Sequence, residues 1–284
     1  LLLWRGIMQW LCGIGIIVVA MVFLPELRVG GMQIFRSEAF DTMGKILPRA
    51  GEIASRISVI YVGLTLACAF AYIVAGMDPF DASVHAMTTV STGGMANSDA
   101  SFGAYDDAIH YIASVFMVLA ALPFVRYVQL LAGSAQPLWR DSQIRTFLGI
   151  LTVVIIGLTA ATWSSQLDHD KPTVVEVLFN VISITTGTGY ASADYMLWGP
   201  LAIMVFFFIG LIGGCAGSTS CSIKDFRYQL LVASIRAQLQ KIRSPHGVFT
   251  PRFEGRPVSE CVLSSVMSFF MFFLVSLGVL PVAL

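Results

Sequence analysis

The chain has 284 residues, of which 56% are hydrophobic and 12% are charged, and its mean hydropathy is +0.79. Seventeen lysines and arginines balance seventeen aspartates and glutamates, so the formal net charge is zero. Because soluble domains carry about a quarter charged residues, this composition excludes an ordinary soluble globular protein.

Uncharged apolar runs recur along the chain. A transmembrane helix needs about 17–25 predominantly apolar residues, and each run comes close to or exceeds this length. The runs are 6–25, 57–77, 108–125, 146–167, 195–223 and 261–284. They predict an all-α membrane protein that crosses the bilayer several times.

The segments between these runs alternate in charge. Lysine and arginine dominate 26–56, 139–145 and 222–260, whereas 78–107 and 168–194 together hold nine acids and one cation. Because basic loops stay in the cytoplasm, we predict that the two acidic segments face the outside. Their acids either raise the local concentration of cations or only solvate external loops. The sequence leaves both readings open.

Two short Gly/Thr-rich stretches, 91–95 and 186–190, lie in the acidic segments. They correspond at an offset of 95 residues without a gap, so Gly94 matches Gly189. A weakly helical segment at 82–90 precedes the first stretch, and a clearly amphipathic one at 174–184 precedes the second. Polar backbone at membrane depth survives only where it is buried in protein or lines a watery path. We therefore predict two re-entrant units, each a half-helix that enters and a loop that returns.

The same units predict a repeat of span, re-entrant pore helix with filter loop, and span. Parallel repeats of this kind, at least four in the full protein, would enclose a central pore. A packed bundle without a path is the alternative. We predict these parts: 1–25, closing span of repeat 1; 26–52, cytoplasmic linker; 53–133, repeat 2 with its pore loop; 144–236, repeat 3 with its pore loop and a mid-span gating loop; 237–259, cytoplasmic linker; 260–284, opening span of repeat 4.

The composition of the two loops suits a dehydrated monovalent cation. Such an ion needs several oxygens to replace its water shell, and backbone carbonyls in an extended loop supply them. Glycine allows dihedral angles that a side chain forbids. The C-terminal end of each half-helix adds partial negative charge. Together these features favour a cation over an anion.

A third glycine cluster falls in the middle of the run 195–223, before a helical pattern that restarts at 223–227. Broken backbone at mid-membrane is costly unless it lines a path, so this cluster predicts a gate below the second loop. Close helix packing through small residues is the other reading. The gate residues would be Gly213, Gly214, Gly217, Ser218, Thr219 and Ser220, followed by Lys224.

Several motifs resemble the Trk-type potassium uptake proteins, the TrkH family of the Trk/Ktr/HKT superfamily. The stretches that carry the resemblance are 9–18, 29–33, 85–94, 185–190, 213–220 and 223–224. It spans the whole chain and implies a four-repeat fold distantly related to potassium channels. It also implies that Gly94 and Gly189 are filter glycines of repeats 2 and 3. The neighbouring ligand oxygens for K⁺ would come from Thr92, Gly93, Gly187 and Thr188.

The resemblance further implies a homodimer in the bacterial inner membrane, seated on a cytoplasmic nucleotide-binding ring of the TrkA type. The basic segments at 222–256 and 28–56 are candidate contacts for that ring. The transported ion would be K⁺, and no organic cofactor is implied. The filters of repeats 1 and 4 are absent from this sequence. Residues 220–222 also read Ser-Cys-Ser where many relatives have glycines, which leaves the flexibility of the gating loop open.

We expect potassium uptake through a carbonyl-lined pore that the glycine-rich loop and a regulatory subunit gate. We do not expect an enzyme, since no nucleotide-binding loop or catalytic triad is apparent. One alternative is a sodium-permeable or H⁺/Na⁺-coupled symporter of the same superfamily. A remote alternative is an intramembrane hydrolase that uses Ser91 or Ser218 as nucleophile and His85 as base.

Overall fold

The computed structural model describes residues 1–22, 50–134, 136–164, 171–244, 247, 249–253 and 256–283. The chain divides into two compact units. Unit 1 comprises Leu1–Val18 and Gly51–Asp225, and unit 2 comprises Val19–Ala50 and Phe226–Leu284. The predicted cytoplasmic linker at 26–52 lies outside the described residues, apart from its last three.

Unit 1 is built from helices. In chain order they are α1 (Leu2–Val22), α4 (Ala50–Val74), α5 (Pro79–Val90), α6 (Asp107–Ala120), α7 (Phe124–Leu131), α8 (Gln136–Arg140), α9 (Ser142–Ser164), α10 (Val174–Thr186) and α11 (Pro200–Gly210), with short 3₁₀ turns η1 (Ser101–Ala104) and η2 (Tyr195–Trp198). The predicted all-α class is confirmed for this unit.

Three described helices are long and apolar enough to cross a membrane, namely Ala54–Val74, Ser142–Ser164 and Glu260–Val279. The pair α6 and α7 makes a fourth if it is counted as one bent span. On α4 and α9 the side chains of Phe70 and Val153 are 68% and 70% exposed. An apolar surface of this kind suits a lipid environment, which is as apolar as the side chains themselves.

The predicted run 195–223 is not one helix. Only its central part forms α11, which ends at Gly210, and a non-helical loop follows up to Lys224. A single β-bridge between Ile212 and Ile223 closes the base of that loop. The break predicted from the glycine cluster is therefore confirmed. Glycine-rich backbone favours the loop over a continuous helix at this point.

Both predicted half-helices are present, and their first turns are capped by residues that the sequence supplies locally. α5 begins after Asp78, whose carboxylate accepts a hydrogen bond from the backbone N–H of Phe80 (3.0 Å). α10 begins with a capping box in which Thr173 and Glu176 satisfy each other's backbone N–H groups. At 12 and 13 residues, both helices are too short to span a bilayer.

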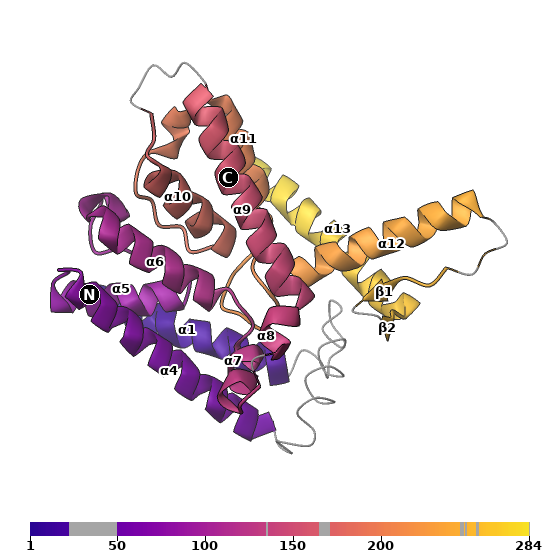
Figure 1. Cartoon of the computed structure of the whole chain (residues 1–284), viewed down its shortest axis with the longest axis horizontal. Coiled ribbons are helices and arrows are strands. Elements are labelled where there is room, and N and C mark those ends of the chain that lie inside the picture. Colours follow the sequence, from indigo (N-terminus) through magenta and orange to yellow (C-terminus); the bar gives the residue numbers. More distant parts are fainter. Residues whose placement is uncertain are drawn as a thin grey trace. The chain divides into compact units, whose positions relative to one another are not determined.

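Helix α10 packs against α6, α9 and α11, and α5 packs against α6 (Figure 1). Aromatic rings fill the junction between the two half-helices. Phe102 of η1 is fully buried, with its ring centroid 5.3 Å from that of Phe179 on α10 and 5.3 Å from that of His85 on α5. Helix α6 and this cluster hold the half-helices side by side, so the loops at their C-terminal ends share one region.

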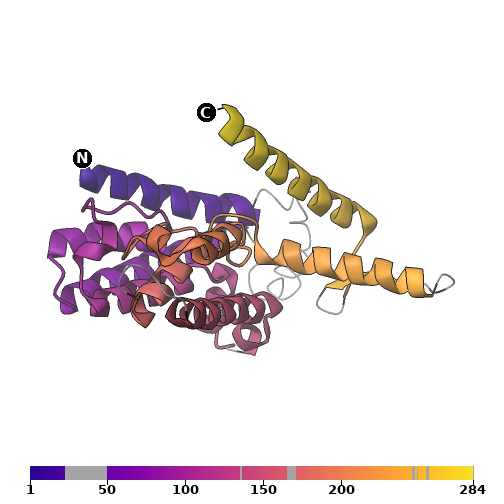
Figure 2. The ribbon, with the colours of Figure 1, turned by 90° about the horizontal axis from the view of Figure 1, so that it is seen from above.

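Unit 2 contains α12 (Asp225–Arg243) from its second residue onward, the antiparallel strands β1 (Arg252–Phe253) and β2 (Arg256–Pro257), and α13 (Glu260–Ala283). Helices α12 and α13, orange and yellow in Figure 2, meet through ring contacts between Tyr228 and Phe270. The guanidinium of Arg227 lies 3.7 Å from the ring centroid of Phe269, a cation–π contact.

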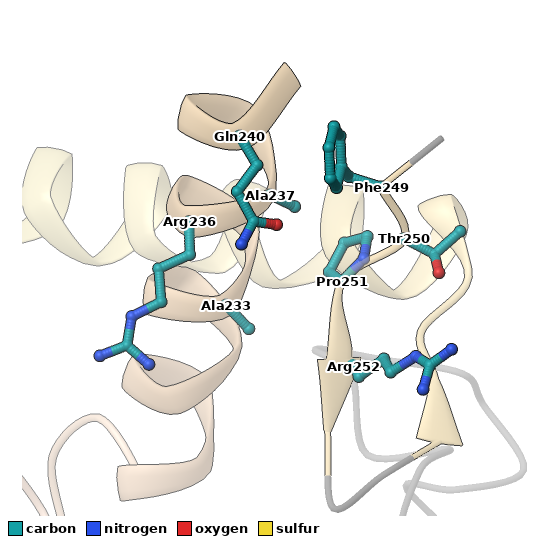
Figure 3. A pocket seen from close by; sticks show the side chains of 8 residues that line it. All are labelled: Ala233, Arg236, Ala237, Gln240, Phe249, Thr250, Pro251 and Arg252. Atoms are coloured by element: carbon teal, nitrogen blue, oxygen red, sulfur yellow. The ribbon is translucent and has the colours of Figure 1, made fainter. Parts of the chain in front are cut away.

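Unit 2 also has an open pocket between α12 and the segment that leads into β1 (Figure 3). It is lined by Ala233, Arg236, Ala237, Gln240, Phe249, Thr250, Pro251 and Arg252. The guanidinium groups of Arg236 and Arg252 point away from one another in Figure 3, so they do not converge on one ligand position.

Helix α12 extends to Arg243, past the predicted repeat boundary at 236.

Candidate functional site

The first Gly/Thr loop, residues 91–95 and hereafter loop A, folds back on the end of α5. The backbone N–H of Thr92 donates to the carbonyl oxygen of Thr89 (3.0 Å). The N–H groups of Gly93 and Gly94 both donate to the carbonyl oxygen of Thr88, at 2.8 and 3.4 Å. These bonds satisfy the final carbonyls of the helix, which would otherwise lack partners.

The second Gly/Thr loop, residues 186–190 and hereafter loop B, repeats this pattern at the end of α10. Gly187 N–H donates to Ile184 (3.0 Å), and the N–H groups of Thr188 and Gly189 donate to Ser183 (2.9 and 3.2 Å). Adding 95 to the donor and acceptor numbers of each loop A bond gives the corresponding bond of loop B. The offset seen in the sequence is therefore present in the backbone hydrogen bonds.

The two loops also share their unusual dihedral angles. The φ values of Gly94 and Gly189 are +72° and +85°, and those of Thr92 and Gly187 are +51° and +74°. Glycine adopts the left-handed region at little cost, whereas threonine is strained there. In loop A the Thr92 hydroxyl donates to the carbonyl oxygen of Thr219 (2.9 Å), which stabilises the strained position.

Loops A and B are in direct contact. A Cβ atom placed on Gly94 would collide with the carbonyl oxygen of Thr188, so at this point the backbones of the two loops touch. The structure thus brings all six predicted filter residues of repeats 2 and 3 together at one place. Helices α5 and α10 also end there, and the partial negative charges at their C-termini favour a cation.

Gln9 on α1 is a neighbour of the loops that the sequence did not single out as a site residue. Its amide nitrogen donates to the carbonyl oxygen of Gly93 (2.8 Å), one of the oxygens that we predicted to face the ion. Its Oε1 atom is buried and has no partner among the described residues. The lone polar side chain within the apolar run 6–25 was the available signal for this residue.

The loop at residues 211–224, hereafter the glycine loop, packs against both filter loops. The Thr219 hydroxyl lies 3.1 Å from the carbonyl oxygen of Val90, the last residue of α5. A Cβ atom on Gly187 would lie 2.8 Å from the Cβ atom of Cys221, so loop B has room only for glycine there. A path through loops A and B would therefore meet the glycine loop directly.

Internal bonds hold the predicted gate residues in a compact turn. The backbone N–H of Gly214 donates to Ser220 Oγ (2.7 Å), and Ser218 Oγ donates to Cys215 O (2.7 Å). The Lys224 ammonium donates to the carbonyl oxygen of Ser220 and lies 3.4 Å from the carbonyl oxygen of Ser218. Lys224 therefore places a positive charge against the backbone of the glycine loop.

The glycine loop is also bonded to the break between α6 and α7, where the two helices meet at 88°. The bend frees backbone carbonyls that a continuous helix would satisfy. Thr219 N–H donates to the carbonyl oxygen of Ala120 (3.3 Å), and Cys215 N–H donates to that of Ala121 (3.0 Å). The carbonyl groups freed at the bend between α6 and α7 are thus hydrogen-bonded to N–H groups of the loop that follows α11.

Gln143, in the first turn of α9, reaches the same loop, and sequence reasoning missed it. Its Oε1 accepts a hydrogen bond from the backbone N–H of Ala216 (3.0 Å), and its side chain is buried. Asp141 precedes it, capping α9 through Oδ1 and pairing with Arg126 through Oδ2 at 2.6 Å. The signal available in the sequence was only a polar residue next to a helix start.

His85 is part of a different arrangement from the one that a hydrolase needs. Its Nδ1 lies 2.8 Å from the carbonyl oxygen of Asp81, and its Nε2 accepts from the backbone N–H of Asn97 (3.3 Å). Ser91 and Ser218 donate to backbone carbonyls. No bond in the described part of the chain joins either serine to His85, so the remote hydrolase alternative lacks its nucleophile–base pair.

Tyr105 completes the network around Asp81. Its hydroxyl donates to Asp81 Oδ2 (3.4 Å), and Asn97 Nδ2 donates to Oδ1 (2.7 Å). Partial burial, assisted by the Asp81 charge, raises the pKa of Tyr105 to about 12, so the hydroxyl stays protonated at neutral pH. This network ties the segment after loop A to the first turn of α5.

Residues 1–280 match the TrkH family model, which is described as a cation transport protein. The chain belongs to the TrkH family. It is 46% identical to the Trk system potassium uptake protein TrkI of Halomonas elongata over 285 residues, covering 99% of this chain and 58% of that protein. It is 34% identical to TrkH of Escherichia coli K12, covering 95% of this chain and 57% of the relative.

The fold agrees with a solved member of the family. The crystal structure of the potassium transporter TrkH from Vibrio parahaemolyticus superposes with a TM-score of 0.86 at 30% identity, covering 98% of this chain and 57% of that one. The chain therefore spans somewhat more than half the length of the relatives that it matches. Its helical architecture is that of the TrkH family, and it is a multi-pass protein of the bacterial inner membrane.

Proposed function

We propose that the full-length protein carrying this chain takes up K⁺ across the cytoplasmic membrane through a pore with a filter of backbone carbonyls. The observation that carries the proposal is the pair of loops A and B. They have matching hydrogen bonds and matching left-handed positions, and they touch at Gly94 and Thr188. Two equivalent carbonyl-rich loops at the ends of two half-helices suit one dehydrated monovalent cation.

The ion is proposed to be held by oxygens of both loops. The residues of loop A are Thr92, Gly93 and Gly94, and those of loop B are Gly187, Thr188 and Gly189. K⁺ is the cargo in this proposal, and the names of the relatives, which are potassium uptake proteins, support it. This chain would supply repeats 2 and 3 of four, so the complete cation site would include loops from outside this sequence.

The glycine loop is the proposed gate. It packs against both filter loops, and Lys224 adds a positive charge against its carbonyls. A cation leaving the filter would meet closely packed backbone and a fixed like charge, and both raise the barrier to flow. Opening therefore requires the loop, from Gly213 to Ser220, to move away from Val90 and Ala120.

The remaining assignments are part of the same proposal. Residues 53–133 and 144–236 form repeats 2 and 3, 1–25 closes repeat 1, 260–284 opens repeat 4, and 237–259 is a cytoplasmic linker. The partners are a second copy of the protein and a cytoplasmic nucleotide-binding ring of the TrkA type. The basic side chains of α12, including Arg236 and Arg243, are candidate contacts for that ring. Copurification of the full-length protein with and without charge reversal on α12 tests this contact.

Rubidium uptake tests the central proposal. The full-length protein is expressed in a bacterial strain that lacks its own potassium uptake, and Rb⁺ entry is measured with increasing external Na⁺. We expect uptake that K⁺ inhibits strongly and Na⁺ inhibits weakly. Uptake equal to that of cells with an empty vector contradicts the proposal.

The alternative within the superfamily is a sodium-permeable or H⁺/Na⁺-coupled symporter. Liposomes that contain the purified protein distinguish it. A pore moves Rb⁺ down its own gradient at a rate independent of pH and Na⁺ gradients. A coupled symporter moves Rb⁺ faster when an H⁺ or Na⁺ gradient is imposed in the same direction as Rb⁺ movement, and more slowly when that gradient is reversed.

A further inference from the structure

Tyr190, the last residue of loop B, reaches out of its own repeat. Its side chain is 1% exposed, and its ring centroid lies 4.2 Å from that of Phe102. Its hydroxyl lies 2.5 Å from Thr88 Oγ1 and 3.3 Å from Thr89 Oγ1, both on α5. The side chain therefore joins loop B to the helix that carries loop A.

Thr88 supports loop A, because its carbonyl oxygen accepts hydrogen bonds from the backbone N–H groups of Gly93 and Gly94. Ser183 has the same role for loop B, and its hydroxyl also donates to the carbonyl oxygen of Tyr190 (2.7 Å). Tyr190 is thus held by Ser183 at its backbone and by Thr88 at its side chain. One residue connects the supports of both filter loops.

The hydrogen-bond directions around Thr88 can be assigned. Thr88 Oγ1 lies 3.2 Å from the carbonyl oxygens of both Val84 and His85 and uses its single proton there. The Tyr190 hydroxyl, which also lies 3.4 Å from the carbonyl oxygen of His85, is then the donor to Thr88 Oγ1 at the shorter distance of 2.5 Å. The contact is buried, so water does not replace the donor when it is lost, and the remaining hydroxyl loses a partner.

We propose that Tyr190 is a positioning residue that sets the spacing between loops A and B and thereby the preference among monovalent cations. The inference rests on the proposed function, because it needs an ion held between the two loops. Contact between Gly94 and the Thr188 carbonyl limits how closely the loops approach. The bond from Tyr190 to Thr88 limits how far they separate.

Among the described residues, loop A has no tyrosine hydroxyl that makes the equivalent bond. At the offset of 95 residues, Tyr190 corresponds to Met95, which has no hydroxyl. The Met95 side chain is 38% exposed, and its sulfur lies 3.3 Å from Nε of Arg5 on α1. The bond from Tyr190 to Thr88 therefore acts at one junction between repeats, and removing it should change selectivity without dismantling either loop.

The test measures the K⁺-to-Na⁺ flux ratio of the full-length protein in liposomes. We expect Tyr190→Phe to lower the ratio about tenfold, the factor that corresponds to about 1.4 kcal/mol. Thr88→Val, which removes the acceptor and keeps the backbone, should lower it similarly. The double variant should fall no further than Tyr190→Phe alone, because that variant already lacks the bond to Thr88. Thr88→Ser keeps the hydroxyl and should retain the wild-type ratio.

Tyr72→Phe is the matched control. The Tyr72 hydroxyl is also buried and bonds to α5, at 2.9 Å from Thr89 Oγ1, but it comes from α4 of the same repeat. Its loss should reduce thermal stability and leave the flux ratio unchanged. An unchanged ratio in Tyr190→Phe, or equal changes in Tyr190→Phe and Tyr72→Phe, overturns the positioning role while the proposed function stands. A wild-type protein without K⁺ flux overturns both.

Discussion

Loops A and B have the same backbone but different supports. In loop A a threonine occupies the left-handed position, and its hydroxyl bonds to Thr219 of the glycine loop. In loop B a glycine occupies that position, and the side chain of Cys221 packs directly against it. Among the described residues, the glycine loop is thus hydrogen-bonded to loop A through Thr92 and meets loop B through the contact of Cys221 with Gly187.

The filter glycines differ in the same way. Gly94 faces the backbone of loop B, whereas a Cβ atom on Gly189 would meet no atom of the described residues within 4 Å. Both have positive φ, so local conformation favours glycine at each. Within this chain, a steric reason for glycine is therefore added to the conformational one at Gly94. Substitutions at the two glycines separate those reasons.

The largest effect is expected from alanine at the two filter glycines. Gly94→Ala forces a Cβ atom into the Thr188 carbonyl, which is backbone and cannot rotate away, so we expect Rb⁺ uptake to be abolished. Gly189→Ala has left-handed strain of about 1–2 kcal/mol and no steric clash with the described residues, so we expect a smaller loss of uptake unless a loop from outside this sequence packs against it. Liposome uptake compares the two variants directly. Uptake that persists in Gly94→Ala contradicts the steric contact with loop B.

Thr219→Val should raise basal flux several-fold. It removes the hydroxyl that bonds to the carbonyl oxygens of Val90 and Ala120, at 3.1 and 3.0 Å, and so loosens the glycine loop. Thr162→Val is the matched control, because that buried hydroxyl donates to backbone carbonyl oxygens of its own helix, those of Leu158 and Thr159. Rb⁺ leak without the regulatory ring is the measurement. A leak as low as in Thr162→Val counts against the gate.

Gln143→Leu should produce a smaller leak than Thr219→Val. It removes one acceptor and leaves the backbone N–H of Ala216 buried without its partner, a cost of about 1–3 kcal/mol. Gln143→Glu retains an acceptor at the same reach and should restore the wild-type leak. A Gln143→Leu variant that is as tight as wild type would show that this contact does not hold the loop.

The smallest effect is expected from Thr92→Gly. The change relieves strain at φ +51° but loses the hydrogen bond to Thr219, and each effect is about 1 kcal/mol. Because they oppose one another, the unfolding temperature should hardly change. A loss of stability as large as that of Thr219→Val would mean that the strain at Thr92 is minor.

Much of the helical framework is predictable because its signals are local. The start of α10 is encoded by the capping box of Thr173 and Glu176, and its end by a glycine able to adopt positive φ. The break after Gly210 follows from the density of glycine in 210–217. The offset of 95 residues identified loops A and B as equivalent. The predicted helical class and the resemblance to the TrkH family are confirmed.

The connections between these elements were not predictable. Gln9 and Gln143 are single polar residues whose partners, Gly93 and Ala216, lie 84 and 73 positions away. Their local sequence does not distinguish them from other polar residues on a helix that make no such contact. Tyr190 was part of a recognised motif, but its bond to Thr88 depends on how two repeats are placed.

The sequence by itself determined the membrane class, the half-helices, the broken span and the equivalence of the two loops, because composition, periodicity and capping act within a few residues. Only the tertiary structure decided that Gly94 contacts loop B, which loop is bonded to the proposed gate and which side chain joins the repeats. Those decisions depend on residues far apart in the sequence, such as Thr88 with Tyr190 and Val90 with Thr219, which are 102 and 129 residues apart. No local pattern specifies such distances.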